Sequence, residues 1–357
     1  MSVRATPSAS APSEPDLLEA ARRGDELAFR RLVGPHRSGL HAHCYRMLAS
    51  VHDAEDALQD ALLRAWRGLQ RFDERSSLRT WLHRIATNAC LDLIRGRPTR
   101  MLPIDYGPPT EPGEQEPQEP VREPIWIEPY PAQDLEIEDA RAAPDARYEQ
   151  REAVELAFVA ALQHLPARQR AILILRDVLG FSAREVAVLL ETTVASVNSA
   201  LHRARSALDE RLPKRSQQAT LRSLGDQRAH DLVERLANAF ERGDIGAILA
   251  LLADDATVAM PPYTGWCQGR DAIGDSWFMP EGPAGRLRHV PARANGQLAL
   301  GVYSLDHATR GYVPICLDVL AVDGEEITEV VAYRALVEFS RFGLPKRLPL
   351  EVNADTG

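Results

Sequence analysis

The stretch Phe181-Ser-Ala-Arg-Glu-Val-Ala-Val-Leu-Leu-Glu-Thr-Thr-Val-Ala-Ser-Val-Asn-Ser-Ala-Leu-His-Arg-Ala-Arg205 predicts two helices joined by a tight turn. Ser182 followed by Glu185 forms a capping box that starts the first helix. Thr193 follows the break in the apolar pattern and can cap the second helix. A short helix, a tight turn and a second helix are typical of a helix-turn-helix, whose second helix enters the major groove of DNA.

The second helix has two different faces. Apolar side chains at i, i+4, i+7 and i+11 predict one buried stripe, made by Val197, Leu201, Ala204 and Leu208. The opposite face is polar and basic, and its candidate DNA-binding residues are Ser196, Asn198, Ser199, His202, Arg203 and Arg205. An ordinary helical hairpin with a solvated outer face is the alternative interpretation.

The distribution of charge divides the 357-residue chain, whose formal charge is −9. Residues 101–152 hold 14 acidic against 4 basic residues, whereas residues 25–100 have a net charge of +4 and residues 153–215 of +3. Two mildly basic blocks therefore flank an acidic tether. This pattern favours a protein that touches DNA with two modules.

The cysteines and the apolar runs exclude several other classes of protein. The four cysteines show no paired spacing, which favours a reducing compartment and excludes a disulfide framework. Neighbours in His41-Ala-His43-Cys44 point in different directions on a helix, so we expect no metal site and no cofactor. No stretch has the roughly 18 apolar residues that span a bilayer, and the N-terminus lacks a signal-peptide core. We expect a cytoplasmic protein without a membrane partner.

Residues 16–97 are expected to be helical throughout. The stretch Asp53–Trp66 is an acidic helix, and Ser77 caps a later helix that ends near Arg95. That later helix interleaves basic groups with Trp81, as single-stranded DNA binding requires, because arginines follow the backbone while aromatic rings stack on unpaired bases. Packing in the core is the alternative for Trp81 and the favoured reading for Trp66.

Two long motifs resemble the extracytoplasmic-function (ECF) sigma factors of the sigma-70 family. Asp53-Ala-Glu-Asp-Ala-Leu-Gln-Asp60 and Ser77-Leu-Arg-Thr-Trp-Leu-His-Arg-Ile-Ala-Thr-Asn-Ala-Cys-Leu-Asp92 are similar to region 2. Leu165-Pro-Ala-Arg-Gln-Arg-Ala-Ile172 and the helix-turn-helix are similar to region 4. Together the motifs cover about 140 residues and occur in the order of the family.

The resemblance implies a partner for each motif. The acidic helix would bind the β′ clamp helices of RNA polymerase core through Asp53, Glu55, Asp56, Gln59 and Asp60. The helix that Ser77 caps, in region 2, would capture the melted −10 element of promoter DNA through Ser77, Arg79, Trp81, His83, Arg84 and Asn88. The helix Val194–Arg205 would read the −35 element, and region 4 would meet the β flap.

The sequence departs from the family pattern in the helix-turn-helix. Asn198 and Ala200 stand where many ECF proteins carry basic residues, which leaves the −35 sequence open. Glu191 stands where the turn often has glycine, so the turn must form without the residue best suited to a left-handed conformation.

The linker and the C-terminal part complete the chain. The Pro- and Glu-rich linker cannot pack a core of its own, but Ile125, Trp126, Ile127 and Tyr130 form an apolar island that we expect to dock on the polymerase or on the C-terminal domain. Residues 226–342 predict helices followed by antiparallel strands, an α+β cone. Ala239–Asp244, Leu251–Val258 and Gly269–Ile273 resemble the SnoaL-like fold.

The predicted fold class is a multi-domain chain with two all-α sigma domains, region 2 and region 4, followed by an α+β SnoaL-like cone. Its predicted divisions are a disordered tail (1–14), region 2 (15–98), the acidic linker (99–150), region 4 (151–213), the cone (226–342) and a C-terminal tail (343–357).

The predicted function is an ECF sigma factor, not an enzyme, whose cone regulates activity and can hold a small-molecule ligand. A stand-alone helix-turn-helix regulator and a cyclase or isomerase fused to DNA-binding helices are the alternatives. The last reading would use polar groups inside the cone, and its candidates are Asp254, Asp255, Tyr263, Trp266, His289 and Asp318.

Overall fold

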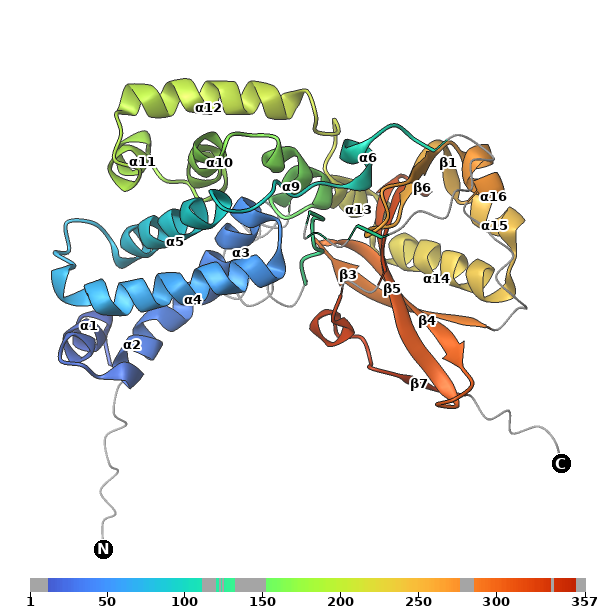
Figure 1. Cartoon of the computed structure of the whole chain (residues 1–357), viewed down its shortest axis with the longest axis horizontal. Coiled ribbons are helices and arrows are strands. Elements are labelled where there is room, and N and C mark those ends of the chain that lie inside the picture. The colour runs from blue at the N-terminus through green and yellow to red at the C-terminus, as the bar shows by residue number, and fades with distance from the viewer. Residues whose placement is uncertain are drawn as a thin grey trace, which may run out of the picture.

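The computed structural model describes residues 12–110, 120–121, 123, 125–131, 152–276, 286–334 and 337–350. Most of the predicted N-terminal tail, most of the acidic linker and residues 351–357 lie outside these ranges. Figure 1 shows the helical modules on one side of the molecule and the sheet on the other. None of the helices in the described ranges has the length and apolar run that a membrane span requires.

The first module is helical, as predicted. It comprises α1 (Glu14–Arg22), α2 (Glu26–Val33), η1 (Gly34–His36), α3 (Arg37–Leu48), α4 (Val51–Gly68), η2 (Leu69–Arg71) and α5 (Leu78–Ile94). Serine side chains accept hydrogen bonds from the first turns of three of these helices, which fixes where each helix begins: Ser13, Ser50 and Ser77. A short helix, α6 (Pro103–Tyr106), starts the linker.

The second module contains the helix-turn-helix. It comprises α9 (Leu156–Gln163), α10 (Ala167–Leu173), the π-helical turn η3 (Ile174–Val178), α11 (Ala183–Leu189), α12 (Val194–Asp209) and α13 (Gln217–Leu224). The Ser182–Glu185 capping box and the Thr193 cap are both present, which confirms those predictions. Glu191 makes the turn in the left-handed conformation, with φ 51°. The sequence did not predict α13.

The third module is the expected α+β unit. It comprises α14 (Asp226–Arg242), α15 (Ile245–Leu249), α16 (Arg270–Ser276) and strands β1 (Leu252–Ala259), β2 (Trp266–Gln268), β3 (Leu287–Ala294), β4 (Gln297–Asp306), β5 (Gly311–Asp323), β6 (Glu326–Arg334) and β7 (Leu348–Pro349). The strands form one sheet in the order β2-β1-β6-β5-β4-β3, and β7 pairs with β5. Only the β1–β6 pairing is parallel among the described strands.

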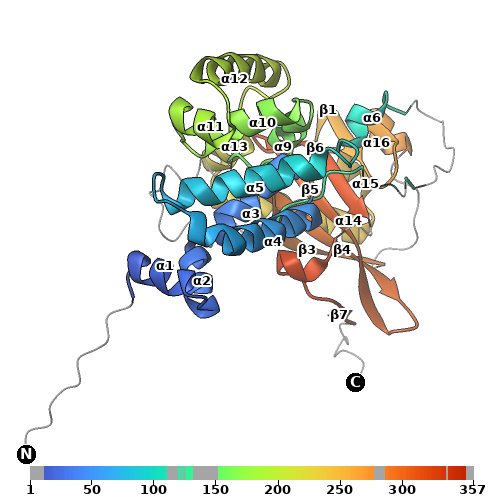
Figure 2. The ribbon, with the colours of Figure 1, turned by 60° about the vertical axis from the view of Figure 1, so that its left-hand side comes forward.

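The two faces of this sheet bury different parts of the chain. Cross-strand partners share a face, so the register Leu298–Leu320–Val330 marks one face and Ala299–Val319–Val331 the other. The first face packs under α14, α15 and α16 in its own core. The second joins a continuous core that also includes the helical modules and, from the apolar island of the linker, Ile127 and Tyr130. Figure 2 shows the ribbon of the molecule from a second direction.

The C-terminal residues are packed where the sequence predicted a tail. Residues 343–350, predicted as tail, pack against the sheet: Leu344 is 4% exposed, and Leu348 pairs with Tyr312. Just before them, η4 (Phe339–Phe342) joins the shared core. The C-terminal segment therefore lies beside the first module, where it contacts α4.

Candidate nucleic-acid and polymerase-binding surfaces

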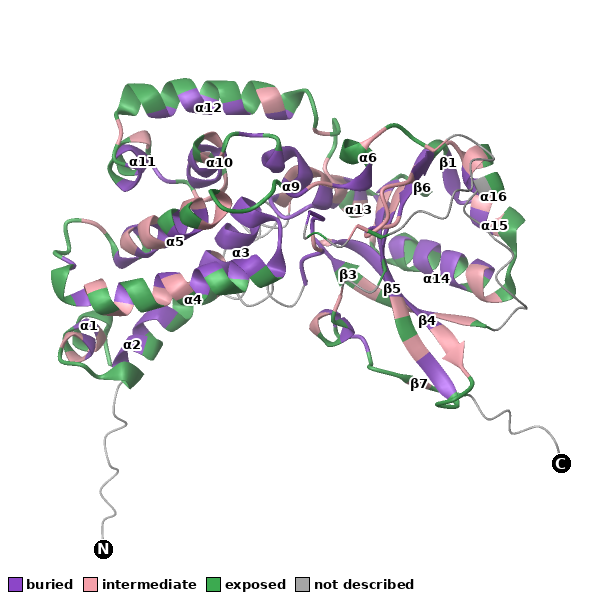
Figure 3. Ribbon diagram, viewed as in Figure 1, coloured by how far each residue is buried: buried purple, intermediate pink, exposed green. Residues whose placement is uncertain are grey.

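The outer face of α12 is open to solvent. All six predicted DNA-binding side chains on it are exposed, whereas Val197, Leu201, Ala204 and Leu208 are buried against the module (Figure 3). Arg205 is held by two hydrogen bonds to the Asp177 carboxylate, at 2.7 and 2.8 Å. Arg203 donates instead to the Ser199 hydroxyl at 2.7 Å, and it forms no ion pair with any described residue.

The predicted −10 face of α5 lies against the second module. The Arg79 guanidinium donates to the carbonyl of Leu179 at 2.8 Å and sits 4.4 Å from the centre of the Phe181 ring. Arg84 forms an ion pair with the carboxylate of Glu191. Two of the arginines predicted for the −10 strand therefore contact the second module. Arg79 contacts the loop before α11, and Arg84 contacts the turn of the helix-turn-helix.

The other predicted −10 residues differ in exposure. Ser77 and Asn88 are exposed, and Ser77 also caps α5. The Trp81 ring is half-buried and lies tilted on Phe72, with ring centres 4.9 Å apart. Part of the ring therefore packs against the module, as the core interpretation expects, and part stays open to solvent, as stacking on a base requires.

His83 has no open surface in this structure. It is 3% exposed, and its Nδ1 donates to the Arg79 carbonyl at 2.9 Å. Its ring meets the edge of Phe181. Burial lowers the pKa of His83 to about 3, so the ring is neutral. The assignment of His83 to the DNA-binding face requires that the two modules separate.

The predicted core-binding helix borders a groove of about 1,200 Å³ between α2, α3 and α4. Glu55 and Gln59 lie at its edge with the exposed Leu63. The floor is apolar and contains Phe29, Val33, Leu58, Leu62 and Trp66. The rim carries charges of both signs, Glu26 and Glu55 against Arg30 and Arg37, so the groove fits a helix with apolar and polar side chains.

The acidic residues of α4 have separate partners. Asp53 is buried and forms ion pairs with Arg97 and Arg100, so it holds the start of the linker and does not face solvent. Asp56 is exposed, and Asp60 pairs with Arg64 on the same helix.

Glu55 pairs with Arg341 of the C-terminal segment, a contact that the sequence did not indicate. The interaction lowers the pKa of Glu55. The predicted polymerase-binding helix is thus partly covered by η4.

The apolar island of the linker is docked on the C-terminal sheet, one of the two partners expected for it, and also on the first module, which was not expected. Ile125, Trp126, Ile127 and Tyr130 are all at most 7% exposed. Asn295, in the β3–β4 turn, accepts from Tyr130 N at 2.8 Å and donates to the Tyr45 hydroxyl at 2.9 Å and to Val154 O at 2.7 Å. One buried amide therefore joins the cone to the linker and both helical modules.

The histidines and cysteine of the His41-Ala-His43-Cys44 run have separate surroundings. His41 Nδ1 bonds to the Tyr130 hydroxyl, and His43 Nε2 bonds to Thr87 Oγ1. Within the described ranges, no cluster of three His, Cys, Asp or Glu side chains is arranged to hold a metal ion.

Both helical modules and the cone match known protein families. The chain matches the families Sigma-70 region 2 over residues 32–98, Sigma-70 region 4 over 155–208 and SnoaL-like domain over 233–330. It is 44% identical to the ECF RNA polymerase sigma factor SigG of Mycobacterium tuberculosis over 92% of this chain and 86% of that protein. The chain therefore belongs to the ECF sigma factors, which are transcription initiation factors and not enzymes.

Two further relatives describe how far the likeness extends. The ECF RNA polymerase sigma factor SigM of Mycobacterium tuberculosis is 33% identical over 55% of this chain and 83% of its own length. The crystal structure of the M. tuberculosis extracytoplasmic function sigma factor SigJ superposes with a TM-score of 0.51, at 20% identity over 87% of this chain and 97% of that one. At that identity the second comparison shows the shared fold. As a sigma factor, the chain has RNA polymerase core and promoter DNA as its partners.

Proposed function

We propose that the exposed face of α12 reads the −35 element, that α5 captures the melted −10 strand and that the groove beside α4 receives the β′ clamp helices. The observation that carries the proposal is the exposure of all six polar side chains of α12 above a buried apolar stripe. A helix presented in this way fits the major groove, whose width admits one helix. Region 4 would also meet the β flap. Both partners place the protein in the cytoplasm.

The residues proposed for each surface follow from their exposure. The −35 set is Ser196, Asn198, Ser199, His202, Arg203 and Arg205. The −10 set is Ser77, Arg79, Trp81, Arg84 and Asn88, and His83 joins it only after the modules separate. The core-binding set is Glu55, Asp56, Gln59 and Asp60, with Asp53 supporting the helix from inside.

The arrangement also supports a regulatory role for the C-terminal domain. The two promoter elements are separate stretches of DNA, so α5 and α12 must contact different stretches at the same time. Here α5 is covered by the second module through Arg84 and Glu191, and α4 is touched by Arg341. We infer that the described conformation is a closed form and that the cone stabilises it, so the cone inhibits promoter opening until it is released.

The interior of the cone is the place we propose for a small-molecule ligand. Val302, Cys316 and Ala332 form an apolar cluster apart from the larger cores. The Cys316 thiol donates to the Asp318 carboxylate at 3.0 Å, and burial raises the pKa of Asp318 to about 6. A thermal-shift screen of apolar ketones and carboxylic acids tests this site, with Asp318→Asn as the variant that should abolish any shift.

Run-off transcription with purified core RNA polymerase tests the main proposal. The full chain should start transcription from core enzyme on a promoter mapped by overexpression of the chain, at a low rate because the cone inhibits promoter opening, and the double variant Asp56→Arg/Asp60→Arg should bind core more weakly. A stand-alone regulator would bind duplex DNA without starting transcription from core enzyme. That result would reject the assignment of α4 and α5.

A further inference from the structure

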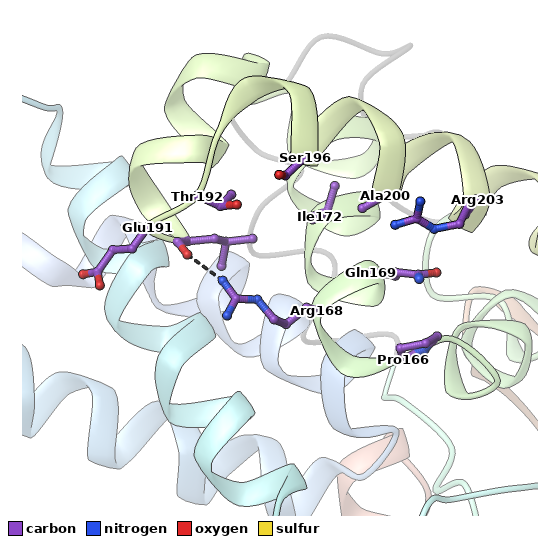
Figure 4. Close-up of a pocket in the computed structure, with 10 residues that line it drawn as sticks. Pro166, Arg168, Gln169, Ile172, Glu191, Thr192, Ser196, Ala200 and Arg203 are labelled. Carbon is purple, nitrogen blue, oxygen red and sulfur yellow. Dashed lines mark hydrogen bonds between the residues drawn. The ribbon is translucent and has the colours of Figure 1, made fainter.

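A hollow of about 470 Å³ lies on one flank of α12, between this helix and α10 (Figure 4). Arg168 and Gln169 of α10 line one side, and Ser196 and Arg203 of α12 line the other. Thr192, from the turn between α11 and α12, completes it. One water occupies about 30 Å³ in the liquid, so the hollow has room for a phosphate group and its remaining waters.

The hollow carries positive charge without an acidic partner of its own. Arg168 is exposed and donates one hydrogen bond, from Nη2 to the carbonyl of Leu190 at 2.7 Å. Neither Arg168 nor Arg203 forms an ion pair with a residue in the described ranges. Glu191 stands at the rim, but its carboxylate points away from Arg168 and is bound to Arg84 of α5 (Figure 4). The charge of the hollow therefore favours an anion.

The position of the hollow on α12 indicates which anion it meets. Ser196, Ala200 and Arg203 follow one another at i, i+4 and i+7, so they form one flank of the helix. A second hollow, lined by Asn198, His202 and Arg205 among others, marks the opposite flank. A helix in the major groove has a DNA backbone on each side, so each flank faces a row of phosphates.

We propose that the hollow seats a phosphate of the promoter backbone beside the −35 element, between Arg168 and Arg203. The hydroxyls of Thr192 and Ser196 would donate to the same phosphate. Arg168 lies on α10, outside the helix-turn-helix, and its bond to Leu190 directs its guanidinium toward the hollow. Arg168 thus binds the phosphate directly: it adds affinity that does not depend on base sequence and fixes the register of α12. The inference rests on the proposed reading role of α12.

The test measures DNA affinity of the full chain against salt. A fluorescein-labelled, mixed-sequence duplex of about 25 base pairs is titrated with wild-type protein and with Arg168→Gln between about 50 and 200 mM salt. Loss of one phosphate contact should reduce the slope of log K against log salt by about 0.9. Arg242→Gln removes the same charge from an exposed site of the cone and should leave the slope unchanged. Glutamine removes the charge and also the Nη2 donor to the Leu190 carbonyl, so equal melting temperatures of the wild type and the variant are required to exclude a purely structural effect.

Arg203→Gln distinguishes failure of the phosphate seat from failure of the proposed DNA-binding role of α12. If Arg203→Gln lowers the slope while Arg168→Gln behaves like Arg242→Gln, α12 binds DNA and the phosphate seat is wrong. If neither variant changes the slope, or the wild-type chain does not bind the duplex, the proposed role of α12 fails as well. If Arg168→Gln keeps the DNA slope and instead weakens capture of core RNA polymerase, the hollow receives an acidic protein segment, and the proposal is overturned.

Discussion

Arg84 of α5 forms an ion pair with Glu191, the residue that makes the turn of the helix-turn-helix in the left-handed conformation. This conformation is costly for a side chain with a Cβ atom, and glycine adopts it more easily. The acidic side chain at this position contacts an arginine proposed to hold the melted −10 strand. The turn between α11 and α12 therefore also covers part of the surface that we propose for the −10 strand.

Removal of the Glu191 charge should open the −10 surface. The pair is largely exposed, and such pairs contribute about 0.2–1 kcal/mol. Glu191→Gln should thus increase the affinity for a labelled single-stranded oligonucleotide by about 1.4- to 5-fold. Fluorescence anisotropy measures the change. Glu210→Gln, at the exposed end of α12, is the control, and equal affinities for both variants would show that the pair does not limit access.

Loss of the Arg341 guanidinium should increase the affinity for core polymerase. Arg341 pairs with Glu55 at the edge of the groove beside α4, so Arg341→Gln uncovers a proposed contact. A partly exposed pair of this kind predicts an increase of at most about fivefold. Surface-immobilised core enzyme provides the measurement. Arg347→Gln changes the same charge in the same exposed segment, and an effect as large as that of Arg341→Gln would assign the change to net charge.

The Asn295 amide should be important for the closed form. Asn295→Ala removes three buried hydrogen bonds, to Tyr130 N, the Tyr45 hydroxyl and Val154 O. Buried groups left without partners cost about 1–3 kcal/mol each, and local relaxation reduces the sum, so we expect a loss of about 2–4 kcal/mol in the first urea transition.

Asn295→Gly separates the backbone from the side chain at this position. Asn295 has φ 53°, which glycine adopts without cost. The difference between the alanine and glycine variants should therefore be about 1 kcal/mol. If Asn295→Gly is as stable as the wild type, the amide does not hold the modules together.

Glu155 should make the contact between α9 and α13 depend on pH. It is buried, its carboxylate accepts from the backbone N–H groups of Gln217 and Gln218, and burial raises its pKa to about 7. Because the folded pKa lies above the ordinary value, this contribution to stability is present at low pH and is lost as the pH rises through about 7. Glu155→Gln should flatten the dependence of unfolding free energy on pH between about 5 and 8. An unchanged profile would assign the titration to another group.

The sequence predicted the fold most reliably where local rules decide the structure. The Ser182–Glu185 capping box, the Thr193 cap and the buried stripe of α12 all appear as expected, because caps and helical periodicity involve neighbours in sequence. The main strands of the cone also appear, but β1 pairs with β6 in parallel where antiparallel strands were expected, because strand pairing depends on distant segments. The docking of Trp126 and Tyr130 was also predicted, since such apolar residues in a polar linker have to be buried.

Contacts between distant parts of the chain were not predictable in this way. Nothing local marks Arg341 as the partner of Glu55, or Asn295 as the partner of Tyr45, because these pairs are 286 and 250 residues apart. His83 and Asp53 have polar side chains on helices that look exposed in sequence. Yet His83 is buried against Phe181 of the second module, and Asp53 is buried in ion pairs with Arg97 and Arg100. Helix α13 and the packing of residues 343–350 likewise depend on surfaces formed by other segments.

By itself, the sequence determined which modules the chain contains, where most helices and strands begin and which face of α12 is polar, since hydrogen bonds and apolar spacing within each segment decide these features. The tertiary structure alone decided that Arg79 and Arg84 face the second module, that Arg341 of η4 touches α4 and that Arg168 shares a hollow with Arg203. Those relationships arise when separate apolar surfaces merge into one core, because burial brings together side chains that have no relation along the chain.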